Sequence, residues 1–174
     1  MSKLKPAVNS RDHVQGNANA PIELVEYGDY QCPHCGRAYP IIKSIQEKMG
    51  NQLKFVFRNF PLAKIHPNAI NAAIATEAAA LQDKFWEMHD YIFEHQDRLD
   101  DVSLIKYAAQ LRLDVEQFEN DFEKQDLAQK VDDDFESGVR SGVNGTPSFY
   151  VHGEKYNGSW DEASFLDYLQ GLLK

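Results

Sequence analysis

Short runs that combine β-branched or aromatic residues with a partial alternation of apolar and polar positions predict the strands of this chain. Four such runs occur, at Ile22–Tyr27, Leu53–Phe57, Ser148–Val151 and Glu154–Tyr156. His152 and Gly153 predict a turn between the last two runs, so these form a hairpin. A short edge strand is also expected near His13 and Val14, after a polar N-terminal tail.

Elsewhere the apolar positions recur at the three- and four-residue spacing of helices. The first helix should begin at Pro33, because a proline at a first helical position has no N–H to leave unpaired, and should end near Gly50. From about Asn68 to Gly142 the spacing predicts a block of four or five helices. A final helix follows the hairpin.

Polar residues predict where three of these helices begin. Ser103 is expected to cap one helix within the block. Asp114 with Gln117 has the spacing of a capping box, in which a side chain accepts a hydrogen bond from the N–H three residues further on. Ser159 with Glu162 has the same spacing before the final helix.

The order strand, helix, strand, helical block, hairpin, helix predicts an α/β protein whose sheet carries helices on both faces. For 174 residues we expect one domain, or one domain with a large insertion. The predicted division is an N-terminal tail and edge strand at residues 1–20, the first part of a core at 21–65, a helical insertion at 66–142 and the second part of the core at 143–174.

The composition describes an acidic protein, with a net charge of -9, 26% charged residues and enough apolar residues, 43%, for a core. A strongly acidic surface is repelled by phosphate backbones and anionic lipids, so nucleic acid is not an expected partner. The chain has no apolar stretch of about 18 residues, so membrane insertion is not expected.

The N-terminus, from Met1 to Pro6, has basic residues but no apolar run after them. It does not match a signal peptide, and the chain as written is therefore expected to be cytoplasmic. A mature form trimmed of its leader would have the same appearance, and would be periplasmic or otherwise exported.

The only two cysteines, Cys32 and Cys35, stand three positions apart at the predicted start of the first helix. A disulfide between them closes too small a loop to restrict the unfolded chain much, so the spacing favours chemistry over a structural bridge. Unpaired N–H groups and the helix dipole favour the thiolate of Cys32, which is the form that attacks a disulfide. Cys35 lies one turn further, within reach to resolve a mixed disulfide. The motif therefore predicts a redox-active pair.

His34 lies between the cysteines and can donate to the Cys32 thiolate or stabilise it by charge, which would make the pair a stronger oxidant. We therefore expect an acidic Cys32 thiol, with a pKa within about 3.5–7.5. The alternative is a solvent-facing His34 with no role in the chemistry.

Half of a zinc site is the main alternative for the cysteine pair, because two intervening residues are also a common zinc spacing. Such a site needs two more ligands, and the chain has no third cysteine. Only His89 and His95, with five residues between them, reach the limit of the usual histidine spacing. The other candidates are His66 and His152. We therefore expect no metal site; two buried inert thiols are a still weaker alternative beside Pro33 and His34.

The motif Cys32-Pro33-His34-Cys35 after an aromatic-containing strand, together with Thr146-Pro147 before a late strand, resembles the DsbA family of bacterial disulfide oxidoreductases. The resemblance extends from about Asp12 onward and includes the helical block. It implies a thioredoxin-like fold with an inserted all-helical subdomain, and a redox-active disulfide that needs no further cofactor. The chain is shorter than many members and lacks the export signal of the periplasmic ones.

The resemblance also implies roles for three further residues. The proline that matches Pro147 is cis and lies beside the cysteines, and Thr146 would offer backbone groups to an extended substrate peptide. Glu26 matches a buried acid that moves a proton for the second cysteine. A carboxyl group inside this apolar strand would have a raised pKa, in agreement with that role. The alternative is that Glu26 points to solvent at a sheet edge.

We therefore predict a thiol–disulfide oxidoreductase that acts on extended or unfolded protein substrates, with a separate redox partner that reoxidises or reduces the pair. A reductase, or a glutathione-linked isomerase or transferase on the same fold, is the second interpretation. Glutathione-linked enzymes typically need no second cysteine, so Cys35 argues against that version. The third interpretation is a non-enzymatic module that binds peptides around Pro147.

Overall fold

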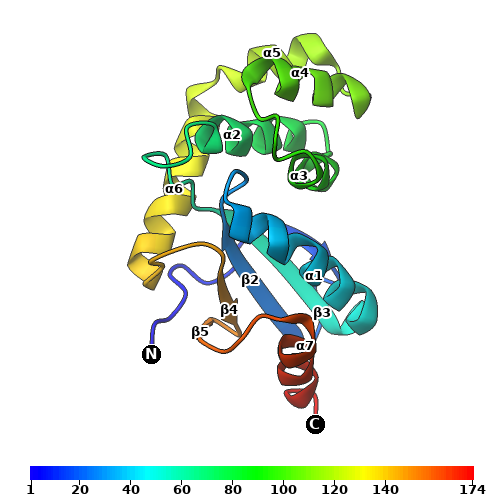
Figure 1. Ribbon diagram of the computed structural model, residues 1–174, viewed down its shortest axis with the longest axis vertical. Helices are drawn as coiled ribbons and strands as arrows, with labels where there is room; N and C mark the ends of the chain where they lie inside the picture. The colour runs from blue at the N-terminus through cyan, green and yellow to red at the C-terminus, as the bar shows by residue number, and fades with distance from the viewer.

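A five-stranded mixed sheet forms the centre of the molecule in the computed structural model, which describes residues 1–174 (Figure 1). Its strands are β1 (His13–Gly16), β2 (Ile22–Gly28), β3 (Leu53–Asn59), β4 (Ser148–Val151) and β5 (Glu154–Tyr156). They lie in the order β1-β3-β2-β4-β5, and only β2 and β3 run parallel. The predicted edge strand and hairpin are confirmed, and β2 is the central strand.

Helices cover both faces of this sheet and one of its ends. They are α1 (Pro33–Met49), α2 (Ala69–Ala80), α3 (Phe85–Glu94), α4 (Asp101–Gln110), α5 (Val115–Phe122), α6 (Gln125–Ser141) and α7 (Glu162–Gly171), with a short 3-10 helix at Gly50–Gln52. α1 and α7 pack on one face, and α6 and the N-terminal segment (residues 1–12) lie on the other. Figure 1 shows α2 to α5 stacked beyond one end of the sheet, with both chain termini toward the opposite end. The predicted α/β fold is therefore confirmed.

No helix combines the length and the apolar character that crossing a membrane requires.

Successive residues of β2 face opposite sides of the sheet, as strand geometry requires. Ile22 and Leu24 belong to the large core under α1, whereas Val25 and Tyr27 belong to a smaller core on the other face. Glu26 stands two residues after Leu24 and therefore faces α1, the helix that carries the cysteines. The alternation along one strand thus brings a carboxyl group to the side of the sheet where the thiols lie.

Aspartates begin the three helices for which caps were predicted. Asp114 caps α5 as predicted, and its carboxylate accepts the N–H three residues further on at 3.0 Å. The cap predicted at Ser103 is wrong, because α4 begins earlier and Asp100 caps it. The cap predicted at Ser159 is also wrong, since Asp161 caps α7. Serine and aspartate cap about equally well, so the preceding loop decides which of them begins the helix.

The N-terminal segment, predicted as a tail, is in fact bound to the molecule. The N–H of Leu4 donates to the carbonyl of Gly153 at 2.8 Å, and the N–H of Lys155 donates to the carbonyl of Ser2 at 3.0 Å. Leu4 is buried in the smaller core. These backbone bonds cover the outer edge of β5, which would otherwise be open to pairing with another chain.

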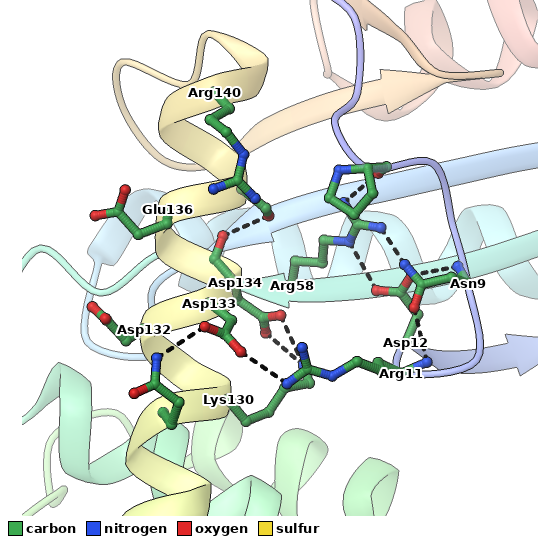
Figure 2. A pocket seen from close by; sticks show the side chains of 13 residues that line it. Asn9, Arg11, Asp12, Arg58, Lys130, Asp132, Asp133, Asp134, Glu136 and Arg140 are labelled. Atoms are coloured by element: carbon green, nitrogen blue, oxygen red, sulfur yellow. Dashed lines mark hydrogen bonds and ion pairs between the residues drawn. The ribbon is translucent and has the colours of Figure 1, made fainter.

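Arg58 of β3 fastens the same segment to the sheet. Its Nε and Nη2 atoms each lie 2.8 Å from a carboxylate oxygen of Asp12, and its Nη1 donates to the carbonyl of Pro6 at 2.9 Å. Only 2% of the Arg58 side chain is exposed. Figure 2 shows the charged pocket of about 410 Å³ around it, between the N-terminal segment, β3 and α6. None of the residues predicted to form the active site lines this pocket.

Candidate active site

Cys32 follows the turn Gly28–Gln31 at the end of β2 and is the N-cap residue of α1. Pro33 stands in the first turn of the helix, so the predicted helix start is confirmed. No side chain caps this N-terminus, and its N–H groups are therefore available to a sulfur at the cap position. Both cysteines are free thiols; Cys32 is 3% exposed and Cys35 is fully buried.

The surroundings of Cys32 favour its thiolate. A hydrogen bond from the Cys35 thiol is the largest cause that lowers the Cys32 pKa, which falls from 9.0 to about 5 in spite of burial. The Thr146 hydroxyl and the backbone N–H groups of His34 and Cys35 lower the pKa further. The value lies within the predicted range. A thiol with this pKa is largely ionised at neutral pH and is therefore nucleophilic.

The surroundings of Cys35 favour its thiol instead. Burial is the largest cause that raises the pKa of Cys35 well above its ordinary value, and the charges of Glu26 and Cys32 raise it further. The backbone N–H of Asp29 opposes this effect by donating to the Cys35 sulfur at 3.4 Å. The two sulfurs therefore differ at neutral pH: Cys32 carries the charge and Cys35 keeps its proton.

Glu26 is buried on the side of the sheet that faces these sulfurs, and only 3% of the residue is exposed. Its Oε1 has no hydrogen-bond partner. Burial, and to a lesser extent the charge of Cys32, raise the pKa of Glu26 from 4.5 to about 8. The alternative of a solvent-facing Glu26 is wrong, because β2 is the central strand. A carboxyl group with this pKa can take up and release a proton near neutrality.

The His34 imidazole does not make the predicted contact with Cys32. Its Nδ1 lies 2.6 Å from Nη2 of Arg37, one turn further along α1, and both side chains are exposed. A guanidinium group can only donate, so Nδ1 accepts this hydrogen bond. The contact of His34 with Cys32 is made by its backbone N–H. The expected side-chain contact is missing because the helix turns the imidazole toward Arg37.

The loop between α6 and β4 meets Cys32 from the other side. The peptide bond between Thr146 and Pro147 is cis, as the resemblance implies. The carbonyl oxygen of Thr146 lies 3.7 Å from the Cys32 sulfur. The Thr146 hydroxyl oxygen is buried and has no hydrogen-bond partner. Residues 114 positions apart in the sequence thus share one site.

Two residues that support the cysteines were not predicted. Asp29 contacts both cysteines through its backbone, since its N–H reaches the Cys35 sulfur and its carbonyl accepts from the Cys32 N–H at 3.1 Å. Gln96, after α3, donates from Nε2 to the carbonyls of Tyr30 at 2.8 Å and Cys32 at 3.0 Å. The position of Asp29 in the turn before Cys32 was a usable signal. Gln96 lies in a loop 64 residues away from Cys32 and gives no such signal.

Three of the four histidines considered as zinc ligands bond to other groups. His66 Nδ1 lies 2.7 Å from a carboxylate oxygen of Asp29, and His89 Nδ1 lies 2.9 Å from the hydroxyl of Tyr30. His95 bonds to a carbonyl of its own helix. No group of three or more His, Cys, Asp or Glu side chains is arranged to hold a metal ion.

Sequence comparison relates almost the whole chain to known proteins. A family model described as Thioredoxin matches residues 8–171. The Na⁺/H⁺ antiporter NhaA 1 of Mycolicibacterium vanbaalenii is 43% identical over 169 residues, which cover 96% of this chain and 27% of the antiporter. The chain therefore spans about a quarter of the length of the curated relatives that it matches.

Solved structures give the same relationship. BdbD from Bacillus subtilis, in its oxidised form, superposes with a TM-score of 0.81 at 26% identity, over 94% of this chain and 93% of BdbD. The thiol-disulfide exchange protein α-DsbA2 from Wolbachia pipientis superposes with a TM-score of 0.83 at 20% identity, over 94% and 88% of the two chains. The family match, the sheet with its inserted helices and the paired thiols together show that this chain belongs to the thioredoxin family and has the DsbA-like form of its fold.

Proposed function

We propose that this protein exchanges disulfides with protein substrates through Cys32 and Cys35. The observation that carries the proposal is the difference between the two sulfurs, since the pKa of Cys32 is lowered to about 5 and that of Cys35 is raised. A disulfide-exchange enzyme needs one sulfur that accepts and releases substrate easily, and a second that returns to close the pair. No cofactor beyond the two cysteines is required.

In the oxidising direction, a substrate thiolate attacks the Cys32 sulfur of the Cys32–Cys35 disulfide. The bond between the two cysteines breaks, and Cys35 leaves as a thiolate that takes a proton. A second substrate thiolate then attacks the substrate sulfur of the mixed disulfide, and Cys32 leaves as a thiolate. The substrate loses two electrons and the protein gains them. The same steps in reverse describe a reductase.

The surrounding residues have proposed roles in this cycle. Glu26 supplies the proton for the departing Cys35 and takes it back, which its pKa of about 8 permits at neutral pH. Pro33 and the backbone N–H of His34 tune the Cys32 thiolate from the first turn of α1. Thr146 and Pro147 hold an extended or unfolded substrate beside Cys32 by backbone hydrogen bonds.

A separate redox partner reoxidises or reduces the pair between cycles. The relatives named as Na⁺/H⁺ antiporters match this chain over about a quarter of their length. We assign thiol–disulfide exchange, and not cation transport, to that part of them, because this chain carries the cysteine pair.

Equilibration with glutathione, followed by alkylation and mass analysis, tests the proposal. We expect the wild-type pair to cycle between dithiol and disulfide, and the Cys32 thiolate of Cys35→Ser to attack an unfolded substrate that contains a disulfide and to accumulate as the mixed disulfide. Cys32→Ser, which keeps the buried thiol, is the matched control and should trap none. Full turnover by Cys35→Ser would favour a glutathione-linked transferase. Wild-type function that survives loss of both cysteines would favour a peptide-binding module.

A further inference from the structure

The loop after β3, residues Phe60–Asn68, is bound to the turn that precedes Cys32. We call it the latch loop. Four hydrogen bonds join it to the turn Gly28–Gln31: Phe60 N–H to Gly28 O at 2.8 Å, Leu62 N–H to Asp29 Oδ2 at 2.9 Å, His66 Nδ1 to Asp29 Oδ2 at 2.7 Å and Asn68 N–H to Gln31 Oε1 at 2.7 Å. Two of the four end on a single carboxylate oxygen, so Asp29 is the main anchor of the latch loop.

The Asp29 carboxylate is buried and well provided with donors. Its side chain is 0% exposed, and its Oδ1 accepts from the N–H of Gln31 at 2.8 Å. A buried carboxylate without such partners would be strongly destabilising, and three donors remove that cost. The Asp29 side chain thereby joins the backbone of the turn, at Gln31, to the backbone of the latch loop, at Leu62, and so holds the Asp29 N–H in place.

His66 supplies the only bond between two side chains in this attachment. Its side chain is 16% exposed. A carboxylate can only accept, so His66 Nδ1 carries the proton and donates it. Because the donor belongs to the latch loop and the acceptor to the turn, this hydrogen bond holds the two segments in a fixed relative position.

We propose that Asp29 and His66 are positioning residues for disulfide exchange, and that together they aim the Asp29 N–H at the Cys35 sulfur. The inference rests on the proposed function. When a substrate thiolate attacks Cys32, Cys35 departs as a thiolate, and the N–H that already points at it receives that charge. A hydrogen bond to a charged sulfur is stronger than one to a disulfide sulfur, so it speeds the step in which Cys35 departs, before that thiolate takes up a proton.

Three variants of His66 test the proposal. His66→Phe and the milder His66→Gln remove the donor at Nδ1, whereas His66→Asn keeps an amide N–H near that position. Gln31→Ala is the matched control, because it breaks the bond to Asn68 of the latch loop but leaves the Asp29 carboxylate its donors.

The first measurement is the rate at which reduced glutathione attacks the Cys32 sulfur of the protein disulfide and releases Cys35. Loss of the donor should slow this reaction by about threefold to tenfold, as expected for one hydrogen bond. His66→Asn should restore most of the wild-type value, and Gln31→Ala should leave it unchanged. An equal slowing in Gln31→Ala would mean that any loosening of the latch loop has this effect, and would overturn the specific role.

The second measurement is amide hydrogen exchange at Asp29 in the reduced protein, which needs no disulfide chemistry. It should become about tenfold faster in His66→Phe and His66→Gln but stay near the wild-type rate in His66→Asn. Unchanged exchange in both loss variants would overturn the inference. A wild-type pair that fails to equilibrate with glutathione, with the expected exchange pattern intact, would refute the proposed function and leave the positioning geometry supported.

Discussion

At the scale of single residues, Glu26 makes stability depend on pH. Its folded-state pKa of about 8 lies above the ordinary 4.5, so the unfolded chain ionises first as the pH rises. The protonated Glu26 carboxyl group therefore makes its full contribution to the free energy of unfolding below about pH 4.5. That contribution is lost as the pH rises from about 4.5 to about 8, and the free energy does not change further with this group above that pH. The steepest possible slope for one group is about 1.4 kcal/mol per pH unit.

We expect the difference in unfolding free energy between Glu26→Gln and the wild type to grow in favour of the variant across this window. Urea unfolding of both reduced proteins, at several pH values between about 4.5 and 8, measures it. Parallel pH profiles for the two proteins would mean that Glu26 is not buried as an acid of raised pKa.

The acidity of Cys32 depends first on its partner sulfur. We expect Cys35→Ala to raise the Cys32 pKa from about 5 toward its ordinary 9.0, because the thiol hydrogen bond is lost. Ultraviolet absorbance of the thiolate during a pH titration reports the midpoint, with Cys32→Ala as the control that lacks the acidic sulfur. An unchanged midpoint in Cys35→Ala would assign the acidity to the helix terminus or to His34 instead.

The sequence was enough to locate Cys32, Cys35 and Glu26, but not to identify what surrounds them. The low pKa of Cys32 was predicted for a partly wrong reason, since the His34 imidazole bonds to Arg37. A side-chain rotamer at a helix surface depends on its neighbours one turn away, and the motif does not include them. The backbone spacing, which the motif does fix, sets the contact between the two sulfurs.

At the scale of elements, the loop after α3 and the start of α1 fit closely. A Cβ atom at Gly36 would lie 2.0 Å from Oε1 of Gln96, whose Nε2 is occupied by the carbonyls of Tyr30 and Cys32. Gln96 cannot move away without giving up those two bonds. Gly36→Ala should therefore cost about 1–3 kcal/mol of stability, and Gln96→Ala a similar amount.

The double variant should cost less than the sum of the two, because truncating Gln96 also removes the atom with which the methyl group added by Gly36→Ala would collide. Urea unfolding of the four proteins completes the cycle. Strict additivity would show that position 36 and Gln96 do not contact each other.

Strand and helix positions followed well from the apolar spacing, and their boundaries less well. β2 and α1 were predictable because a strand, a turn and Pro33 leave few alternatives. The caps at Ser103 and Ser159 were wrong since a nearby aspartate caps each helix equally well. The bound N-terminal segment was missed because backbone pairing with β5 needs no apolar pattern.

At the scale of the whole molecule, the bidentate pair of Arg58 and Asp12 joins the N-terminal segment to the sheet. Both side chains are almost completely buried, with 2% and 4% exposed. Arg58→Met should cost about 3–5 kcal/mol, since it leaves the Asp12 charge buried without its partner. Arg11→Ala is the control: its pair with Asp133 is 61% and 39% exposed, and its loss should cost about 0–1 kcal/mol.

Chemical denaturation measures both changes in free energy, and limited proteolysis shows whether residues 1–12 come loose first in Arg58→Met. Equal losses for the two variants would mean that burial does not distinguish these pairs. The pair joins residues 46 positions apart, and neither stands in a pattern that identifies the other, so the sequence could not predict it.

Both chain termini lie toward one pole of the molecule, and α2 to α5 lie at the other (Figure 1). Cys32 stands where α1 begins, within hydrogen-bonding distance of Gln96 from that helical end. A flexible tether fused to either terminus therefore emerges on the side remote from the reactive sulfur. A domain carried in this way, by a larger protein or by an engineered support, has its carrier on the side of the molecule away from Cys32.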